Sequence, residues 1–177
     1  WHRSQIVHQK IFSVKATINE ALFDITWEHF TDQEDKKNCL YYIKWNSYDV
    51  SNTLDVECFT VNVNADLEDQ FKRLQNNGHF GEFCIRLIAE QILTELIQQT
   101  LRFARIDGSE PQIDTPHQKF KYLLEDKLHY NFDDLAKKMQ SKNKLEQLQV
   151  IADIRKIMQR MNAVGSSLRV IRFGGYR

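Results

Sequence analysis

The chain has 177 residues, of which 42% are apolar and 27% are charged. This length predicts one domain, or one domain with a small satellite, that buries a hydrophobic core. No low-complexity tract, internal repeat or signal peptide is recognisable in the sequence. The first residue is Trp1 rather than methionine. We therefore expect a single α+β domain over residues 1–177 that belongs to a longer protein.

The net charge is zero, but the charges are unevenly distributed along the chain. Residues 1–118 carry 11 basic and 18 acidic side chains, a net charge of −7, whereas residues 119–177 carry 13 and 6, a net charge of +7. Such a split can indicate an anionic partner for the basic end. It can equally reflect attraction between the two halves, or a separate partner for the acidic half.

Three cysteines, Cys39, Cys58 and Cys84, are widely spaced and lie among apolar residues. An odd number in such contexts favours free buried thiols in a reducing compartment over a disulfide framework. The sequence therefore predicts an intracellular location.

The first part of the chain, residues 1–64, has the alternation of apolar and polar residues that is typical of half-buried strands. The alternation covers residues 12–18 and 23–27, and two further strands are predicted at Cys39–Trp45 and Leu54–Val63. Because the connections are short, we expect consecutive strands to pair as antiparallel neighbours. The prediction is an antiparallel β-meander of about four strands.

A long helix is predicted from Gly81 to Ile106, where apolar residues recur at spacings of three and four. Its apolar arc is wide, which is typical of a helix covered on most sides. Charges at Arg86, Glu90 and Arg102 make a membrane span too costly. We expect this helix to cover one face of the meander and to be the centre of the fold.

Residues 65–164 are predicted to be mainly helical. A short helix starts near Asn64 and ends at residues 76–78, and Thr115-Pro116 and Asn131 have the features of helix starts. Residues 141–161 are predicted to form a second long helix. Residues 165–177 are expected to contain a short final strand, at Leu168–Phe173, and a tail.

Motifs for catalysis or cofactor binding are absent from the sequence. The six histidines are scattered without a metal-ligand spacing. Gly78 and Gly81 precede a helix but lack the lysine-serine pair of a phosphate-binding loop, and no G-x-S-x-G elbow occurs. We therefore predict a non-enzyme with no catalytic residue, no metal and no cofactor.

The string YYIKWNSYDVSNTLDVE, from Tyr41 to Glu57, resembles the core strand of a chromodomain. The resemblance implies that Trp45 and Tyr48 form two walls of an aromatic cage for methyl-lysine, with Phe23 as a third wall. The sequence departs from the family pattern at Ser47, Leu54 and Val56, among other positions.

The second long helix supplies the predicted partner surface. One seam of this helix contains adaptable apolar residues, methionine above all. The first hypothesis for function is therefore a non-catalytic scaffold or adaptor module of a larger intracellular protein or complex, which binds a protein partner or a second copy of itself. The alternative is that the same seam closes the domain's own core. The proposed partner-binding residues are Leu148, Ile151, Met158 and Met161.

The basic C-terminal region supports a second hypothesis, in which the domain binds nucleic acid. Cations there alternate with Phe173 and Tyr176, and nucleic-acid surfaces combine such charges with stacking aromatics. An acidic protein could bind the same region. The cations are Arg155, Lys156, Arg160, Arg169 and Arg172.

Overall fold

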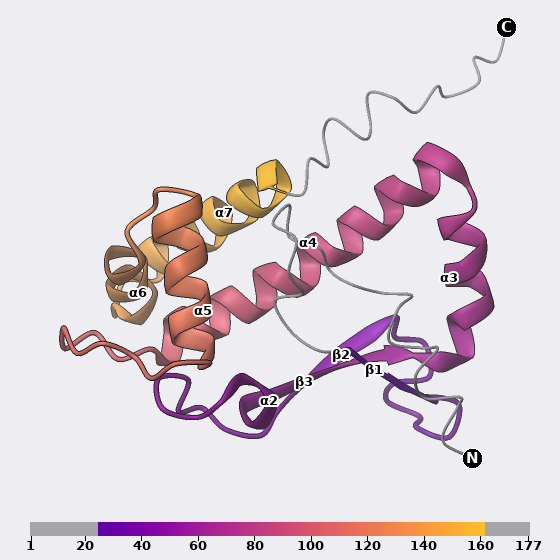
Figure 1. Ribbon diagram of the computed structural model, residues 1–177, viewed down its shortest axis with the longest axis horizontal. Coiled ribbons are helices and arrows are strands. Elements are labelled where there is room, and N and C mark those ends of the chain that lie inside the picture. The colour runs from indigo at the N-terminus through magenta and orange to yellow at the C-terminus, as the bar shows by residue number, and fades with distance from the viewer. Residues whose placement is uncertain (1–24, 162–177) are drawn as a thin grey trace, which may run out of the picture.

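The computed structural model describes residues 25–161, which form a three-stranded sheet and a group of helices around one long helix, α4 (Figure 1). This confirms the predicted α+β class. The predicted first strand and final strand lie outside the described residues. The strands are β1 (Ile25–Glu28), β2 (Tyr41–Trp45) and β3 (Phe59–Asn64), and the helical elements are α2 (Asp55–Cys58), η1 (Ala65–Leu67), α3 (Glu68–Gln75), α4 (Gly78–Phe103), α5 (Pro116–Tyr122), η2 (Leu123–Lys127), α6 (Phe132–Gln140) and α7 (Lys144–Met161).

The strand order is β1-β3-β2, so β3 is the central strand of the sheet. β1 pairs with β3 in parallel, with Ile25 opposite Val61. β2 pairs with β3 in the antiparallel direction, with Tyr41 opposite Val63. The predicted meander is therefore wrong for β1 and β2, which are separated by β3 instead of forming a hairpin.

A polar clamp at the end of β3 explains this order. Asp66 accepts hydrogen bonds from the backbone N–H groups of Phe30 and Thr31, each at 2.9 Å, and from the Thr31 hydroxyl at 2.6 Å. Hydrogen bonds from Thr31 and from His29 lower the pKa of Asp66 to about 2. The side-chain amide of Asn64 donates to the Cys39 carbonyl at 3.0 Å. These contacts hold the chain that leaves β1 beside the end of β3.

The predicted strand at residues 54–63 begins only at Phe59, because residues 55–58 form the helical turn α2. The Cys58 N–H donates to the Leu54 carbonyl at 2.8 Å. The buried Asp55 carboxylate forms an ion pair with Lys119 at 2.5 Å, and the Asp55 N–H donates to the Asp114 carbonyl. The turn is therefore fixed by groups far away in the sequence.

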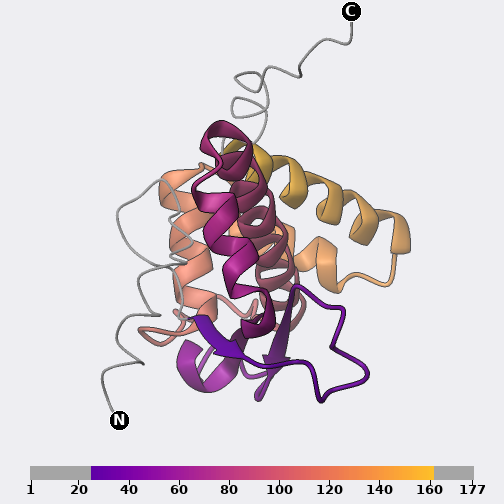
Figure 2. The ribbon, with the colours of Figure 1, turned by 90° about the vertical axis from the view of Figure 1, so that its right-hand side faces the viewer.

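The helix α4 is the core of the fold, as its apolar arc predicts. Figures 1 and 2 show it lying across the sheet, with α3 on one side and α5, α6 and α7 around its C-terminal half. It begins and ends three residues before the predicted bounds. At its end the Gln140 side chain donates to the carbonyls of Leu101 and Ala104, at 2.9 and 2.8 Å, so α6 caps the last turn of α4. The apolar residues of α4 that are fully enclosed include Ile92, Leu93, Leu96, Ile97 and Leu101.

Two predicted helix starts are confirmed by their caps. The Thr115 hydroxyl accepts the Gln118 N–H at 3.3 Å, with Pro116 at the first helical position of α5. The Asn131 side chain accepts the Asp134 N–H at 2.8 Å at the start of α6. Each cap satisfies a backbone donor that has no partner within its helix.

Candidate interaction surface

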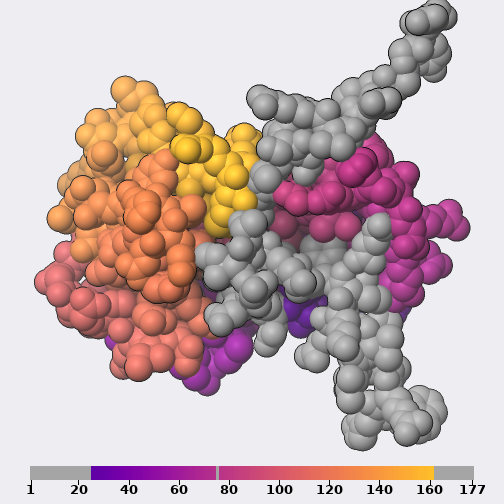
Figure 3. All heavy atoms as spheres, turned by 45° about the horizontal axis from the view of Figure 1, so that its top comes forward, coloured from indigo at the N-terminus to yellow at the C-terminus, as the bar shows by residue number. Residues whose placement is uncertain are grey.

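The helix α7 packs against α4 and α6 with one side and faces solvent with the other (Figure 3). Its buried residues are spaced by three and four positions, so they form one stripe on a helix of 3.6 residues per turn. This stripe joins the common hydrophobic core. It consists of Val150, Ile154, Ile157 and Met158.

The four predicted partner-binding residues do not share one side of α7. Their spacing is close to three residues per step, and each such step turns by about 300° around a helix, so the row rotates from the solvent side at Leu148 into the core stripe at Met158. Leu148 is 62% exposed, Ile151 and Met161 are partly buried against the core, and Met158 is completely enclosed. Met158 is therefore a core residue, and its assignment to a partner surface is wrong.

Opposite the core stripe lies a second row at spacings of three and four, which we name the outer face of α7. Two leucines dominate its first half, where Leu145 is 74% exposed and Leu148 is 62% exposed. The exposed Ala152 continues the row, and two cations complete it. The sequence does contain this second row, but periodicity alone does not say which of two rows faces the core. The outer face comprises Leu145, Leu148, Ala152, Arg155 and Lys156.

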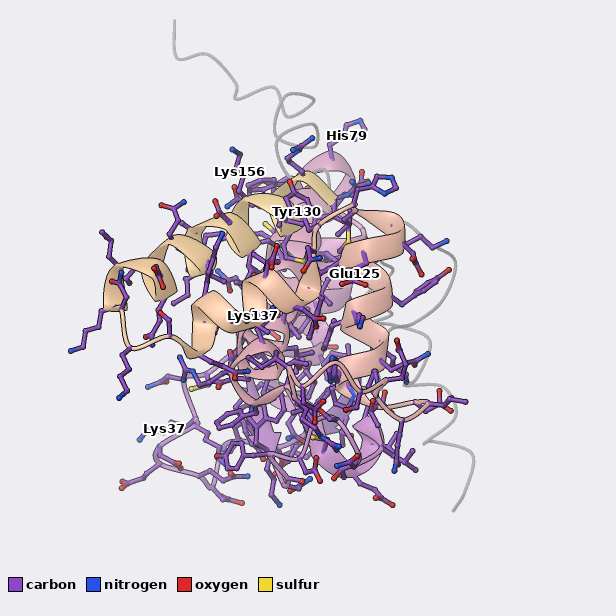
Figure 4. All side chains as sticks on the ribbon, turned by 90° about the vertical axis from the view of Figure 1, so that its left-hand side faces the viewer. Lys37, His79, Glu125, Tyr130, Lys137 and Lys156 are labelled. Carbon is purple, nitrogen blue, oxygen red and sulfur yellow. The ribbon has the colours of Figure 1, made fainter. Side chains whose placement is uncertain are left out.

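The leucines of the outer face lie among basic residues. Lys142, Lys144 and Lys156 are exposed, and within residues 25–161 none of them forms an ion pair with an acidic side chain. In Figure 4 Lys156 lies on the side of α7 away from α6. Arg155 differs, because it interacts with an acidic group of α4: burial raises the pKa of Glu90, and the Arg155 charge offsets part of that rise. The outer face therefore combines exposed apolar side chains with positive charge.

Three of the five residues predicted to bind nucleic acid lie within the described part of the chain. Arg155 and Lys156 lie on the outer face, and Arg160 is exposed one turn further along α7. Arg169 and Arg172 lie outside the described residues. The Asp55–Lys119 ion pair shows that the acidic and basic halves do attract each other at one point.

A cavity of about 340 Å³ lies at the C-terminal end of α7, between this helix and the turn that joins η2 to α6. Arg160 and Met161, which the sequence assigned to two different surfaces, both line it. No acidic side chain is among the described residues that form its wall. The wall consists of Lys127, Leu128, Tyr130, Ile157, Arg160 and Met161.

A buried serine and histidine meet beside the start of α6. The Ser51 hydroxyl lies 2.9 Å from His117 Nδ1 and also accepts the Arg105 N–H at 3.0 Å. Both residues are buried, and the His117 ring stacks on Phe132 with 4.7 Å between ring centroids. The pair joins three segments of the fold, and the cavity described above is lined by other residues. We assign it a structural role.

Burial lowers the pKa of His117 below its ordinary value of about 6.5, with a smaller lowering contribution from Lys121. The unfolded chain therefore protonates the His117 imidazole more readily than the folded chain does. The contribution of neutral His117 to stability is complete above roughly pH 6.5 and is lost as the pH falls below that value. In urea unfolding at pH 7.5 and 5.5, His117→Gln should lose less stability between the two pH values than the wild type does. The control His79→Gln, at an exposed position, should keep the wild-type difference. An unchanged difference in His117→Gln would contradict this role of burial.

The two aromatic residues of the chromodomain resemblance do not face each other as cage walls. Trp45 packs on Phe59, with 5.2 Å between ring centroids, and Tyr48 packs on Phe103 at 4.6 Å. Within the described part of the chain, no aromatic contact joins Trp45 to Tyr48. Phe23 lies outside that part. The described residues therefore do not assemble the cage.

In residues 25–161 no group of three or more histidine, cysteine, aspartate or glutamate side chains is placed to hold a metal ion. Over the same residues no helix is both long enough and apolar enough to cross a bilayer. Comparison of the chain with protein-family models, curated proteins and solved structures finds no match. The fold class is therefore given by the α+β architecture, and a function has to be argued from the surfaces described above.

Proposed function

We propose that this chain is a non-catalytic protein-interaction module that binds an acidic, amphipathic helix of a partner protein on the outer face of α7. The observation that carries the proposal is the pair Leu145 and Leu148, which are 74% and 62% exposed beside lysines without ion pairs in the described chain. Leucines spaced along one helix face are typical anchors for helix-to-helix docking.

The charges around the leucines favour an acidic partner over a neutral one. Lys142, Lys144 and Lys156 surround the apolar row, and Glu146 is the exposed acidic residue nearest to it in sequence. Complementary charges at the rim of an interface raise the association rate and exclude partners with the wrong charge. The leucines supply the buried area, and the lysines supply orientation and specificity.

A synthetic helical peptide tests this proposal, with leucines at spacings of three and four and flanking glutamates. We expect it to bind the wild-type chain in fluorescence anisotropy, and we expect Leu145→Glu combined with Leu148→Glu to weaken binding at least about tenfold, because the substitutions remove the anchors and add repulsive charge. Ile113→Glu is the matched control, since Ile113 is equally exposed but lies on the α4–α5 loop. It should bind like the wild type.

The same assay identifies other occupants. Peptides with lysine in place of glutamate should bind weakly. Equal binding of the double variant and the wild type would overturn the proposal. The proposal is also overturned if single-stranded RNA displaces the peptide and its affinity falls steeply with rising salt. The double substitution Arg155→Glu with Lys156→Glu should then abolish RNA binding, because this pattern defines a nucleic-acid site. Concentration-dependent dimerisation that Leu148→Glu abolishes would identify a second copy of the chain as the occupant.

A further inference from the structure

We propose that the cavity at the C-terminal end of α7 is a binding site for a small aliphatic carboxylate, separate from the outer face of α7. The volume of about 340 Å³ is at the lower end of the range for ligand pockets, which is about 300–1,000 Å³. A ligand of this kind would place its hydrocarbon chain against the apolar wall and its carboxylate between two cations. The proposal goes beyond protein docking and does not depend on it.

The apolar part of the wall comes from two segments that are distant in sequence. Leu128 and Tyr130 come from the turn after η2, and Ile157 and Met161 come from α7. All except Ile157 are partly buried side chains packed against the core, and Ile157 belongs to the core itself. In Figure 4 Tyr130 lies between α7 and the helical segment that contains Glu125. The floor is therefore held by packed elements on both sides, as a preformed pocket requires.

The turn that carries Leu128 and Tyr130 has an unusual backbone. The preceding element η2 is a π-helix, and His129 has a φ of 59°, in the left-handed region that few residues other than glycine adopt. The Tyr130 N–H donates to the Leu124 carbonyl at 2.7 Å and fixes the turn. Through this conformation the residues on either side of His129 both reach the cavity. Single π-helical turns and left-handed residues are enriched at binding sites.

The charged part of the wall selects the ligand's head group. Lys127 and Arg160 line the cavity, and the described wall contains no acidic residue. Each cation lies in the last turn of its helix, where the helix dipole contributes roughly half a negative elementary charge. Two full positive charges exceed these partial charges, so the cavity attracts an anion. The nearby Glu125 carboxylate accepts the Phe132 N–H at 3.0 Å, at the start of α6. An arginine binds a carboxylate through two parallel hydrogen bonds.

Methyl NMR of the methionines provides the test, with octanoate as the probe. The chain has three methionines, so each methyl group gives one signal. Met161 lines the cavity, whereas Met139 lies in the core and is absent from the cavity wall. We expect octanoate to shift the Met161 signal in a saturable manner and to leave the Met139 signal in place. Octanol should bind more weakly by about tenfold, and octylammonium should not bind, because each lacks the carboxylate that the two cations recognise.

Charge variants complete the test. Lys127→Gln and Arg160→Gln should each weaken octanoate binding by about tenfold, since each removes a charge-assisted contact from an exposed side chain. Lys144→Gln, at the opposite end of α7, removes the same charge and should bind octanoate like the wild type. The proposal is overturned if Met161 does not shift, if octanol binds as tightly as octanoate, or if both cavity variants bind like the wild type. Leu145→Glu with Leu148→Glu should retain octanoate binding, which keeps this result independent of the docking proposal.

Discussion

Leu96→Ala should destabilise the protein by about 2–5 kcal/mol. Leu96 is completely enclosed in the middle of α4, and it belongs to the cluster that joins α4 with the sheet and α7. Removing its side chain deletes apolar contacts and leaves a cavity, because tightly packed neighbours relax only in part. Urea unfolding of the wild type and the variant measures the difference in the free energy of unfolding.

The matched control is the same substitution on the outer face of α7. Leu148→Ala removes an identical side chain from a position that is 62% exposed, so the free energy of unfolding should change by no more than about 0.5 kcal/mol. Both substitutions keep a good helix former, so backbone propensity does not separate them. Equal losses of stability at the two positions would show that α4 is not the enclosed element or that α7 does not expose this side.

Gly81→Ala should destabilise the protein by about 3 kcal/mol, at the upper end of the usual cost of overpacking. A Cβ atom at Gly81 would lie 1.4 Å from the carbonyl oxygen of Leu74, which is backbone and cannot rotate away. The helices α3 and α4 would have to separate. Thermal unfolding measures the loss, and hydrogen exchange of the α3 amides should accelerate, because α3 loses its close contact with α4.

Gly108→Ala is the comparison for this substitution. A Cβ at Gly108 meets no atom within 4 Å, but the residue has a φ of +82°, so the cost is backbone strain alone, about 1 kcal/mol. Gly81→Ala should therefore lower the melting temperature clearly more than Gly108→Ala. A smaller effect at Gly81 than at Gly108 would contradict the close approach of α3 and α4.

The elements with strong local signals could be predicted from the sequence. The apolar periodicity of α4 and the caps at Thr115 and Asn131 act within a few residues, so a pattern detects them. The order of the strands could not be predicted, because the contacts that set it join Asp66 to Phe30 and Thr31, more than thirty positions apart. The turn α2 was missed for the same reason, since its Asp55 is held by Lys119.

The four residues predicted to bind a partner all lie on α7, but they differ in exposure. Leu148 is exposed as a partner surface requires, whereas Met158 is enclosed in the core. The helix contains two apolar rows, and sequence spacing does not decide which row faces α4. The cavity could not have been predicted, because its wall brings Tyr130 next to Met161 through a left-handed turn at His129 that has no glycine to mark it.

Solvent exposure of leucine methyl groups tests most directly whether α4 is enclosed while α7 presents its outer face. A soluble paramagnetic agent, added to a dilute methyl-labelled sample, broadens the NMR signals of methyl groups that reach solvent. We predict strong broadening for Leu145 and Leu148 and sharp signals for Leu93, Leu96 and Leu101. Broadening of Leu96 to the extent of Leu148, or protection of both Leu145 and Leu148 in the monomer, would contradict the enclosed helix and the open surface.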